Sequence, residues 1–264
     1  MGPNQLIDIA IQAALLAGEK IMEVYASGDF AIAQKDDFSP LTKADRQAHQ
    51  VISQILESTQ IPVLSEEGIH LPFAERLHWK TFWLVDPLDG TKEFISRNDE
   101  FTVNIALIDE NQSIAGVIYC PVSRELYVGL VGLGAWKVQD PRTGTTLGWI
   151  SQHGARLPLE NTKDAFTVAA SRTHLDDQTV AFIKDLKKLH PELKISRKGS
   201  SLKFCLLAEG SADIYPRFGP TMEWDTAAGH AIVKAVGKNV FHTGQQTEIH
   251  YNKENLMNPY FIAL

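Results

Sequence analysis

The sequence predicts an α+β lobe followed by an α/β lobe. Two amphipathic segments with helical spacing come first, β-rich segments separated by short turns follow, and strands alternate with helices after about residue 150. Helices on one face of an antiparallel sheet define the α+β class, and regular alternation defines the α/β class. We expect the boundary between Asp140 and Thr146, which gives an N-terminal lobe of residues 1–145 and a C-terminal lobe of residues 146–264.

The N-terminal lobe is expected to begin with two helices. Apolar residues recur at mostly helical spacing over residues 6–25, and the pattern stops near Gly28. A second helix should begin near Thr42, with Ala48, Val51, Ile52 and Ile55 on its buried side. The following β-rich runs cover residues 79–85, 101–108, 114–119 and 125–131. Turn-forming clusters separate these runs, which predicts an antiparallel meander covered on one face by the two helices.

The C-terminal lobe is expected to alternate. Strands are predicted over residues 166–170 and near Ile195, Ile214 and Val240. Helices are predicted over residues 175–189, from Ser201 to Gly210, and over residues 226–236. This lobe should carry the substrate pocket, whereas most metal ligands should lie in the N-terminal lobe.

Composition and charge narrow the class of protein. The 264 residues are 44% hydrophobic and 22% charged, which is typical of a globular protein. Thirty-two acidic residues against 25 Lys and Arg give a net charge of −7, which argues against binding long nucleic acids. Cys120 and Cys205 form no metal-ligand spacing and suit a reducing compartment. No targeting or membrane segment is expected, so we predict a cytoplasmic location.

The sharpest local signal is the segment from Asp86 to Thr91, which follows an apolar run. Pro87 fixes φ and Gly90 permits a tight turn at the end of a strand. Such a turn can aim Asp86, Asp89 and the Leu88 carbonyl at one point, where these oxygens would suit a hard divalent cation. The absence of nearby Cys or His favours magnesium over zinc. The alternative is a surface β-turn, in which these residue types are common.

Four further acidic residues, in three segments, are ambiguous when taken alone. Glu66 and Glu67 end an apolar segment and could belong to a solvated loop or a helix start. Asp225 could be the N-cap of the helix that follows it. Asp45 fits a capping box with Thr42.

Together these pieces resemble the lithium-sensitive, magnesium-dependent phosphatase superfamily that includes inositol monophosphatase, fructose-1,6-bisphosphatase and 3′(2′),5′-bisphosphate nucleotidase. The Asp-Pro-Leu-Asp-Gly-Thr motif stands at residues 86–91, the acidic pair at 66–67 precedes it, and Trp224-Asp225 is followed by Thr-Ala-Ala-Gly. Longer strings at residues 83–95, 101–108, 199–205 and 215–220 are similar to the bacterial bisphosphate nucleotidases. The resemblance covers nearly the whole chain and implies a layered αβαβα sugar-phosphatase fold.

The resemblance implies a metal site and a set of catalytic residues. One Mg²⁺ would be held by Glu66, Asp86 and the Leu88 carbonyl, and a second by Asp86, Asp89 and Asp225, with a third, looser ion near Glu66 possible. The catalytic residues would be Thr91 and Glu66, which orient the attacking water, and Asp45, which accepts the proton of the Thr91 hydroxyl.

The implied substrate is adenosine 3′,5′-bisphosphate (PAP), a small bisphosphorylated nucleotide from sulfate assimilation. Its hydrolysis would yield AMP and phosphate. Substrate-binding residues carried over from the family, or chosen as donors for the second phosphate, are Glu66, Leu88, Asp89, Gly90, Thr91, Ser171, His174, Ser200, Lys203, Arg217 and Asp225. Without the resemblance, Lys203 and His174 would be interpreted as solvated surface.

Three alternatives stay open. The chain could hydrolyse inositol or sugar phosphates, sense a metal or nucleotide without catalysis, or cleave short oligonucleotides. Family membership would also permit peripheral association with the inner face of the membrane.

Overall fold

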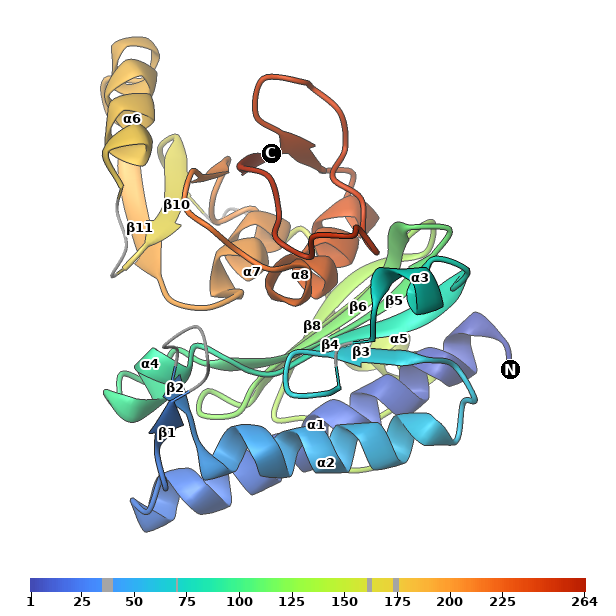
Figure 1. Ribbon diagram of the computed structural model, residues 1–264. Helices are drawn as coiled ribbons and strands as arrows, with labels where there is room; N and C mark the ends of the chain where they lie inside the picture. Colours follow the sequence, from blue (N-terminus) through green and yellow to red (C-terminus); the bar gives the residue numbers. More distant parts are fainter. Residues whose placement is uncertain (35–39, 70, 161–162, 173–175) are drawn as a thin grey trace.

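Helices and sheets alternate in five layers in the computed structural model of the chain (Figure 1). Helices α1 (Pro3–Ser27) and α2 (Lys43–Glu57) cover one face of a seven-stranded sheet, and α8 (Glu223–Ala235) lies on the other face with α7 (Leu202–Glu209) beside it. The strands of the C-terminal half come next, and α6 (Asp177–Leu189) is outermost. The structure describes residues 1–34, 40–69, 71–160, 163–172 and 176–264. The expected αβαβα arrangement is confirmed.

The first two helices begin and end where local residues dictate. Gly28 takes the left-handed conformation with φ 73°, and its N–H bonds the Val24 carbonyl, which ends α1. Thr42 caps α2, since its hydroxyl accepts from the N–H groups of Ala44 and Asp45. The Asp45 carboxylate in turn accepts from the Thr42 N–H at 2.7 Å, which completes the capping box.

The seven-stranded sheet contains the predicted meander. Its order is β3 (Val63–Ser65), β4 (Thr81–Asp89), β5 (Thr102–Asp109), β6 (Gln112–Cys120), β7 (Glu125–Leu130), β8 (Gly134–Gln139) and β9 (Ala155–Arg156). Only the β3–β4 pair is parallel within this sheet of described residues. Strands β3, β8 and β9 were not predicted. Strands β3 and β9 are too short to show a hydrophobic period.

The expected boundary near residue 145 falls inside this sheet. Strand β9 follows the short helix α5 (Leu147–His153) and pairs with β8, so the sheet takes in residues on both sides of the boundary. The division into residues 1–145 and 146–264 therefore stays a proposal.

Helix α8 packs closely on the sheet, with apolar side chains from both halves of the chain in one core cluster. At Gly116 on β6, an added Cβ would lie 2.2 Å from the Ala228 carbonyl oxygen. The close approach therefore needs glycine at this position. It brings the start of α8 near the end of β4, where the acidic residues lie.

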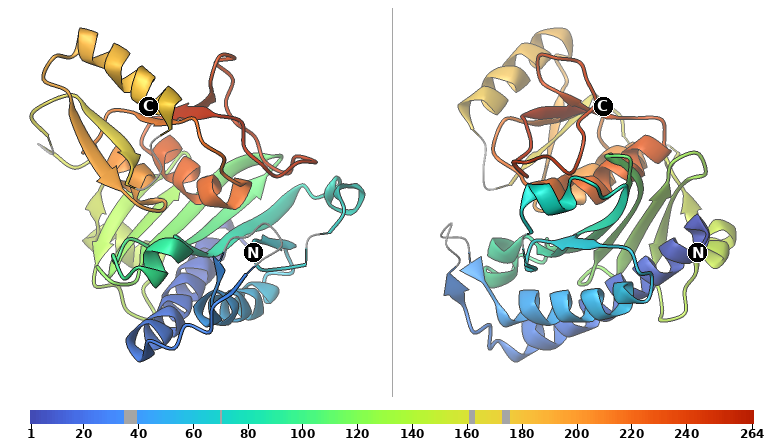
Figure 2. Two further views of the ribbon diagram at one scale, coloured as in Figure 1. Left: turned by 60° about the vertical axis from the view of Figure 1, so that its left-hand side comes forward. Right: turned by 45° about the vertical axis from the view of Figure 1, so that its right-hand side comes forward.

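Two smaller sheets complete the C-terminal half, as Figure 2 shows from two sides. Strands β10 (Thr167–Ser171) and β11 (Lys194–Lys198) are parallel, and β12 (Tyr215–Arg217), β14 (Phe261–Ala263) and β13 (Val240–His242) are antiparallel. The predicted alternation is confirmed except for the unpredicted β14. Helix α6 was expected from Leu175, which lies outside the described residues, and it begins at Asp177.

Four short elements remain, namely β1 (Ala33–Gln34), β2 (Pro40–Leu41), α3 (Phe73–Arg76) and α4 (Thr91–Ile95). Across the described ranges, none of the helices combines the length and apolar character needed to cross a membrane.

Candidate active site

Carboxylates from three separate segments meet at the end of strand β4. One ligand oxygen from each of Glu66, Asp86 and Asp225 lies within 4.8 Å of the others. The parallel pairing of β3 with β4 brings Glu66 beside Asp86, because Ser65 is in register with Val85 and parallel strands end at the same edge. Asp225 arrives from the first turn of α8. Glu66 and Asp225 are partly buried and Asp86 is buried.

The Asp86–Thr91 turn is a buried structure, so the surface β-turn interpretation is wrong. Asp86 is 1% exposed and Leu88 is 2% exposed. The Leu88 N–H donates to Asp86 Oδ1 at 3.1 Å, which fixes the aspartate within the turn. Gly90 takes φ 93° before α4, and an added Cβ would lie 3.1 Å from the Glu100 carbonyl oxygen.

Asp225 is not the N-cap of α8, which corrects one interpretation of the sequence. The helix begins at Glu223 with Met222 as its N-cap, and Asp225 is the third helical residue. Its Oδ2 accepts from the Met222 N–H at 2.8 Å. This reach-back bond ties one carboxylate oxygen to the helix start.

The acidic group fits a divalent cation. Burial raises the pKa of Asp86 well above its usual value, and the charges of Glu66, Asp89 and Asp225 raise it further. Burial likewise raises the pKa of Asp225, with further contributions from Asp89 and Glu66. A cation among these oxygens would remove the repulsion. The group consists only of carboxylates, which are the ligands that magnesium prefers.

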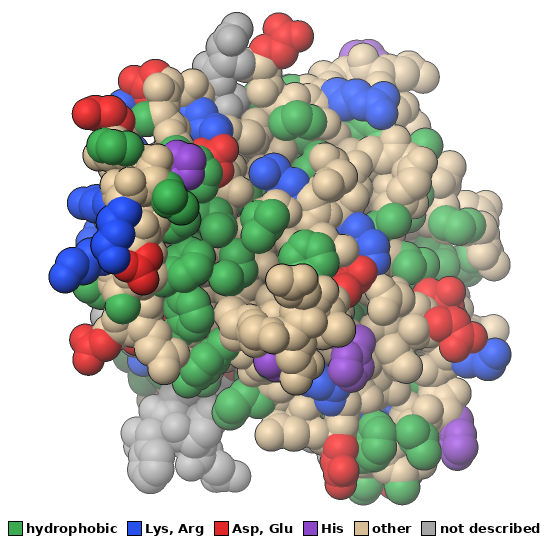
Figure 3. Space-filling model, turned by 90° about the horizontal axis from the view of Figure 1, so that it is seen from above, with side chains coloured by type: hydrophobic (Ala, Val, Ile, Leu, Met, Phe, Trp, Pro, Cys, Tyr) green, Lys and Arg blue, Asp and Glu red, His purple; other side chains and the backbone are tan. Residues whose placement is uncertain are grey.

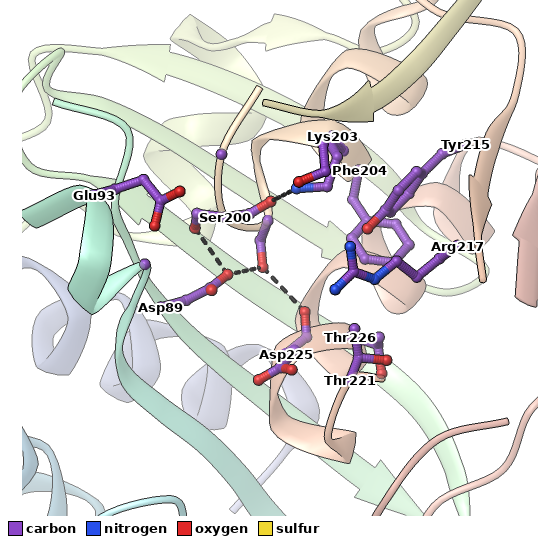
Figure 4. Close-up of a pocket in the computed structure, with 14 residues that line it drawn as sticks. Asp89, Glu93, Ser200, Lys203, Phe204, Tyr215, Arg217, Thr221, Asp225 and Thr226 are labelled. Atoms are coloured by element: carbon purple, nitrogen blue, oxygen red, sulfur yellow. Dashed lines mark hydrogen bonds between the residues drawn. The ribbon is translucent and has the colours of Figure 1, made fainter. Parts of the chain in front are cut away.

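Asp89 lies outside the 4.8 Å group, and its carboxylate turns toward the start of α7 (Figure 4). Its Oδ2 accepts from Ser201 Oγ at 2.7 Å, Ser200 Oγ at 2.8 Å and Asn104 Nδ2 at 3.2 Å. Neither Asn104 nor Ser201 was predicted as a site residue. A signal was available for Asn104, because it is an amide between the apolar residue Val103 and the apolar run Ile105–Ile108 of β5.

Asp45 performs the capping-box role and also contacts the predicted water-orienting residue. Asp45 is 1% exposed. Its Oδ2 accepts from the Thr42 N–H and hydroxyl. Its Oδ1 lies 3.1 Å from the Thr91 hydroxyl, which is also 3.3 Å from the Leu88 carbonyl oxygen. The two oxygens of one carboxylate therefore serve a helix cap and Thr91 at the same time.

A cavity of about 170 Å³ opens beside the acidic turn (Figure 4). It brings together seven predicted site residues, namely Asp89, Gly90, Ser171, Ser200, Lys203, Arg217 and Asp225. Its lining also includes residues that were not predicted, among them Glu93, Ser201 and Tyr215. Glu66, Leu88 and Thr91 are not part of this lining. His174 lies outside the described residues.

Two cationic side chains line the cavity. Lys203 is 6% exposed, so its interpretation as solvated surface is wrong. Burial lowers the pKa of Lys203 to about 8, with an opposing contribution from Asp89. Its Nζ donates to the Ser200 carbonyl at 2.6 Å and the Lys198 carbonyl at 3.3 Å.

The second cation is Arg217, which ends strand β12. One of its terminal nitrogens, Nη2, donates to the Pro220 carbonyl at 3.1 Å. Its Nε is buried and has no hydrogen-bond partner among the described residues. A buried donor without a partner is costly, so an incoming acceptor would be favoured here.

Glu100 fixes the loop that precedes α7. Its carboxylate accepts two hydrogen bonds from Arg172, at 2.8 and 2.6 Å, and one from the Gly199 N–H at 2.8 Å. Burial alone would raise the pKa of Glu100, but these bonds and Lys198 lower it to about 2. The clamp holds the end of β10 and the start of α7 around the cavity.

Comparison with known proteins places the chain among phosphatases. The inositol monophosphatase family model matches residues 3–263. The chain is 45% identical to 3′(2′),5′-bisphosphate nucleotidase CysQ of Salmonella typhimurium over 260 residues, which cover 97% of this chain and 98% of that protein. It is 31% identical to the CysQ of Haemophilus influenzae over 99% of this chain and 91% of that protein.

Solved structures agree with this placement. The crystal structure of CysQ from Bacteroides thetaiotaomicron matches with a TM-score of 0.89 and 51% identity, over 97% of this chain and 95% of that one. The suhB protein of Bartonella henselae, at 24% identity and a TM-score of 0.76, shares the fold over 98% of this chain and 93% of that one. The chain belongs to the inositol monophosphatase family.

Proposed function

We propose that the chain is a magnesium-dependent 3′(2′),5′-bisphosphate nucleotidase that removes the 3′-phosphate of PAP. One observation carries the proposal. A single cavity is lined by the carboxylates of Asp89 and Asp225, by the buried cation Lys203 and by the partly buried cation Arg217 (Figure 4). Two sites for phosphate, one through metal ions and one through side-chain cations, suit a bisphosphate. The names of the CysQ relatives support this substrate class.

The family is metal-dependent, generally with Mg²⁺, and the carboxylates of this chain fit that requirement. We assign one ion to Glu66, Asp86 and the Leu88 carbonyl, and a second to Asp86, Asp89 and Asp225. A third near Glu66 is part of the same proposal. When bound, the ions would neutralise the charge that makes a phosphate monoester repel a nucleophile.

Thr91 and Asp45 would handle the proton of the attacking water. The Thr91 hydroxyl donates to Asp45 Oδ1 at 3.1 Å, which leaves the oxygen of Thr91 able to accept a proton from a water molecule. The Asp45 carboxylate is held by Thr42, the N-cap of α2, whose N–H and hydroxyl both donate to its Oδ2. Its position beside Thr91 is thereby set before substrate arrives. Glu66 would orient the same water from the end of β3.

Lys203 and Arg217 would receive the 5′-phosphate. Both line the cavity, and a charge-assisted bond from Arg217 Nε to a phosphate oxygen would satisfy that buried donor. Ser171 and Ser200 line the same cavity, and the Ser171 hydroxyl would add a neutral donor. An inositol monophosphate has no second phosphate to use these cations, so the cavity favours the nucleotide over that alternative.

The test compares phosphate release from PAP, inositol 1-phosphate and fructose 1,6-bisphosphate, each with and without Mg²⁺. We expect Mg²⁺-dependent release with the highest kcat/KM on PAP. Preference for either sugar phosphate would refute the nucleotidase assignment. Binding of PAP without phosphate release would instead support the sensor alternative.

Cleavage of oligonucleotides is the less favoured alternative. On the face seen in Figure 3, the Lys and Arg side chains of the described residues stand in separate groups among acidic and apolar ones. A continuous basic track for a nucleic-acid backbone is therefore not offered there. Offering a dinucleotide under the same conditions tests this point. The cytoplasmic location and the peripheral membrane association stay predictions.

A further inference from the structure

We infer that Asn104 and Ser201 are positioning residues that hold the Asp89 carboxylate in one orientation and leave its Oδ1 as the metal ligand. This inference rests on the proposed function, because it takes Asp89 to be a ligand of one magnesium ion. It assigns a task to two residues whose side chains come from different halves of the chain, on β5 and at the start of α7.

Three donors converge on one oxygen of Asp89. Oδ2 accepts from Ser201 Oγ, Ser200 Oγ and Asn104 Nδ2 at 2.7, 2.8 and 3.2 Å. A carboxylate oxygen has about two lone-pair sites, so these donors saturate Oδ2. In the described part of the chain no hydrogen bond reaches Oδ1. The carboxylate therefore offers a cation one oxygen rather than two.

Asn104 and Ser201 both act as donors toward Asp89. Asn104 Nδ2 donates to Ser201 Oγ at 2.8 Å as well as to Asp89, while its Oδ1 accepts from the Thr102 hydroxyl at 3.0 Å. Reversing the amide would turn its carbonyl oxygen against the carboxylate, so the orientation of Asn104 is determined. Ser201 Oγ accepts a hydrogen bond from Asn104 and donates its own to Asp89 Oδ2 at 2.7 Å, which is nearer than the Asp225 carbonyl at 3.1 Å.

Of the three donors to Asp89, Ser200 is the one that water could most easily replace. Its hydroxyl contacts Thr102 Oγ1 at 2.6 Å as well as Asp89, and the residue itself is only partly buried. Asn104 is 1% exposed and Ser201 is 2% exposed, so water has little access to replace a donor lost there. Partners that orient a metal ligand change metal affinity by about 10- to 100-fold when removed.

The main variant is Ser201→Ala. Ser201 precedes α7, but its side chain makes no capping bond and its φ is −70°, so alanine fits this backbone. Mg²⁺ binding to the substrate-free chain is measured by isothermal titration calorimetry, with thermal unfolding as the check on folding. We expect about tenfold weaker binding at one class of site, and an Mg²⁺ requirement for PAP hydrolysis that rises by the same factor. The KM for PAP at saturating Mg²⁺ should stay unchanged.

Asn104→Ala should weaken Mg²⁺ binding in the same direction. Ser201→Cys keeps a similar shape with a weak donor and tests the same bond if the alanine variant does not fold. The matched control is Ser211→Ala, because the Ser211 hydroxyl bonds Glu209 at the far end of α7. This control should keep wild-type affinity.

Wild-type Mg²⁺ affinity in folded Ser201→Ala and Asn104→Ala chains would overturn the inference. A wild-type chain that binds Mg²⁺ but does not hydrolyse PAP would refute only the proposed function. Calorimetry would still measure how the variants change Mg²⁺ affinity. A wild-type chain that binds no Mg²⁺ would refute both.

Discussion

Replacing Lys203 with methionine tests the site proposed for the second phosphate. The substitution keeps an unbranched side chain of similar length in a position that is 6% exposed, and removes the charge. A hydrogen bond to a charged group contributes about 1.5–3 kcal/mol, and 1.36 kcal/mol corresponds to a factor of ten. We therefore expect kcat/KM for PAP to fall by roughly 10- to 150-fold.

The assay compares two substrates at pH 7, where a lysine with a pKa of about 8 is still mostly protonated. Phosphate release from PAP is measured beside release from adenosine 3′-monophosphate, which lacks the 5′-phosphate. The kcat/KM for adenosine 3′-monophosphate should fall little, because binding of its reacting phosphate does not depend on Lys203. Lys184→Met, on the exposed face of α6, is the matched control and should behave as wild type on both substrates.

An equal loss on both substrates would refute this reasoning. It would mean that Lys203 acts by supporting the Ser200 and Lys198 carbonyls rather than by contacting the 5′-phosphate. Full activity on PAP would refute it as well.

Four further predictions concern the metal site, pH and packing. Asp89→Asn should abolish Mg²⁺-dependent phosphate release while thermal unfolding stays cooperative; near wild-type turnover would contradict the two-metal assignment. Burial lowers the pKa of Lys203 to about 8, so kcat/KM for PAP should fall as pH rises above about 8, with no such fall for adenosine 3′-monophosphate. Gly116→Ala should lower the free energy of unfolding in urea by about 2–3 kcal/mol, because the added Cβ would lie 2.2 Å from a carbonyl oxygen of α8; an unchanged midpoint would contradict the close packing. Burial opposes ionisation of Glu100, yet Arg172 and other donors bring its pKa from 4.5 to about 2; this stabilisation is present above pH 4.5 and is lost as pH falls toward 2. The gap in Tm between wild type and Glu100→Gln should therefore narrow over that pH range, and a constant gap would argue against the ion pair.

Much of the fold was predictable because its signals are local. The period of α1, the Thr42 cap of α2 and the turn residues of the meander act within a few positions of the chain. The short strands β3 and β9 were missed, because two or three residues carry no period and depend on pairing with a neighbour.

The residues of the candidate site were predictable mainly through resemblance, whereas their caps and burial were not. The Asp86–Thr91 motif and its relation to Glu66 and Asp225 came from resemblance, and the structure brings one oxygen of each of three of these carboxylates together. The cap position of Asp225 was misjudged, because the helix already begins at Glu223, with Met222 at the N-cap position. The exposure of Lys203 was misjudged when the residue was considered alone, because burial is a property of packing.

By itself the sequence determined the order of the longer helices and of most meander strands, the tight turn at Gly90 and the family to which the chain belongs. These follow from periodicity, from backbone constraints at Pro and Gly, and from a motif of adjacent residues. Only the tertiary structure decided which oxygen of Asp89 is held and that Lys203 lies in the cavity. The physical reason is that these features depend on contacts between distant segments, such as Asn104 and Ser201, which are 97 positions apart.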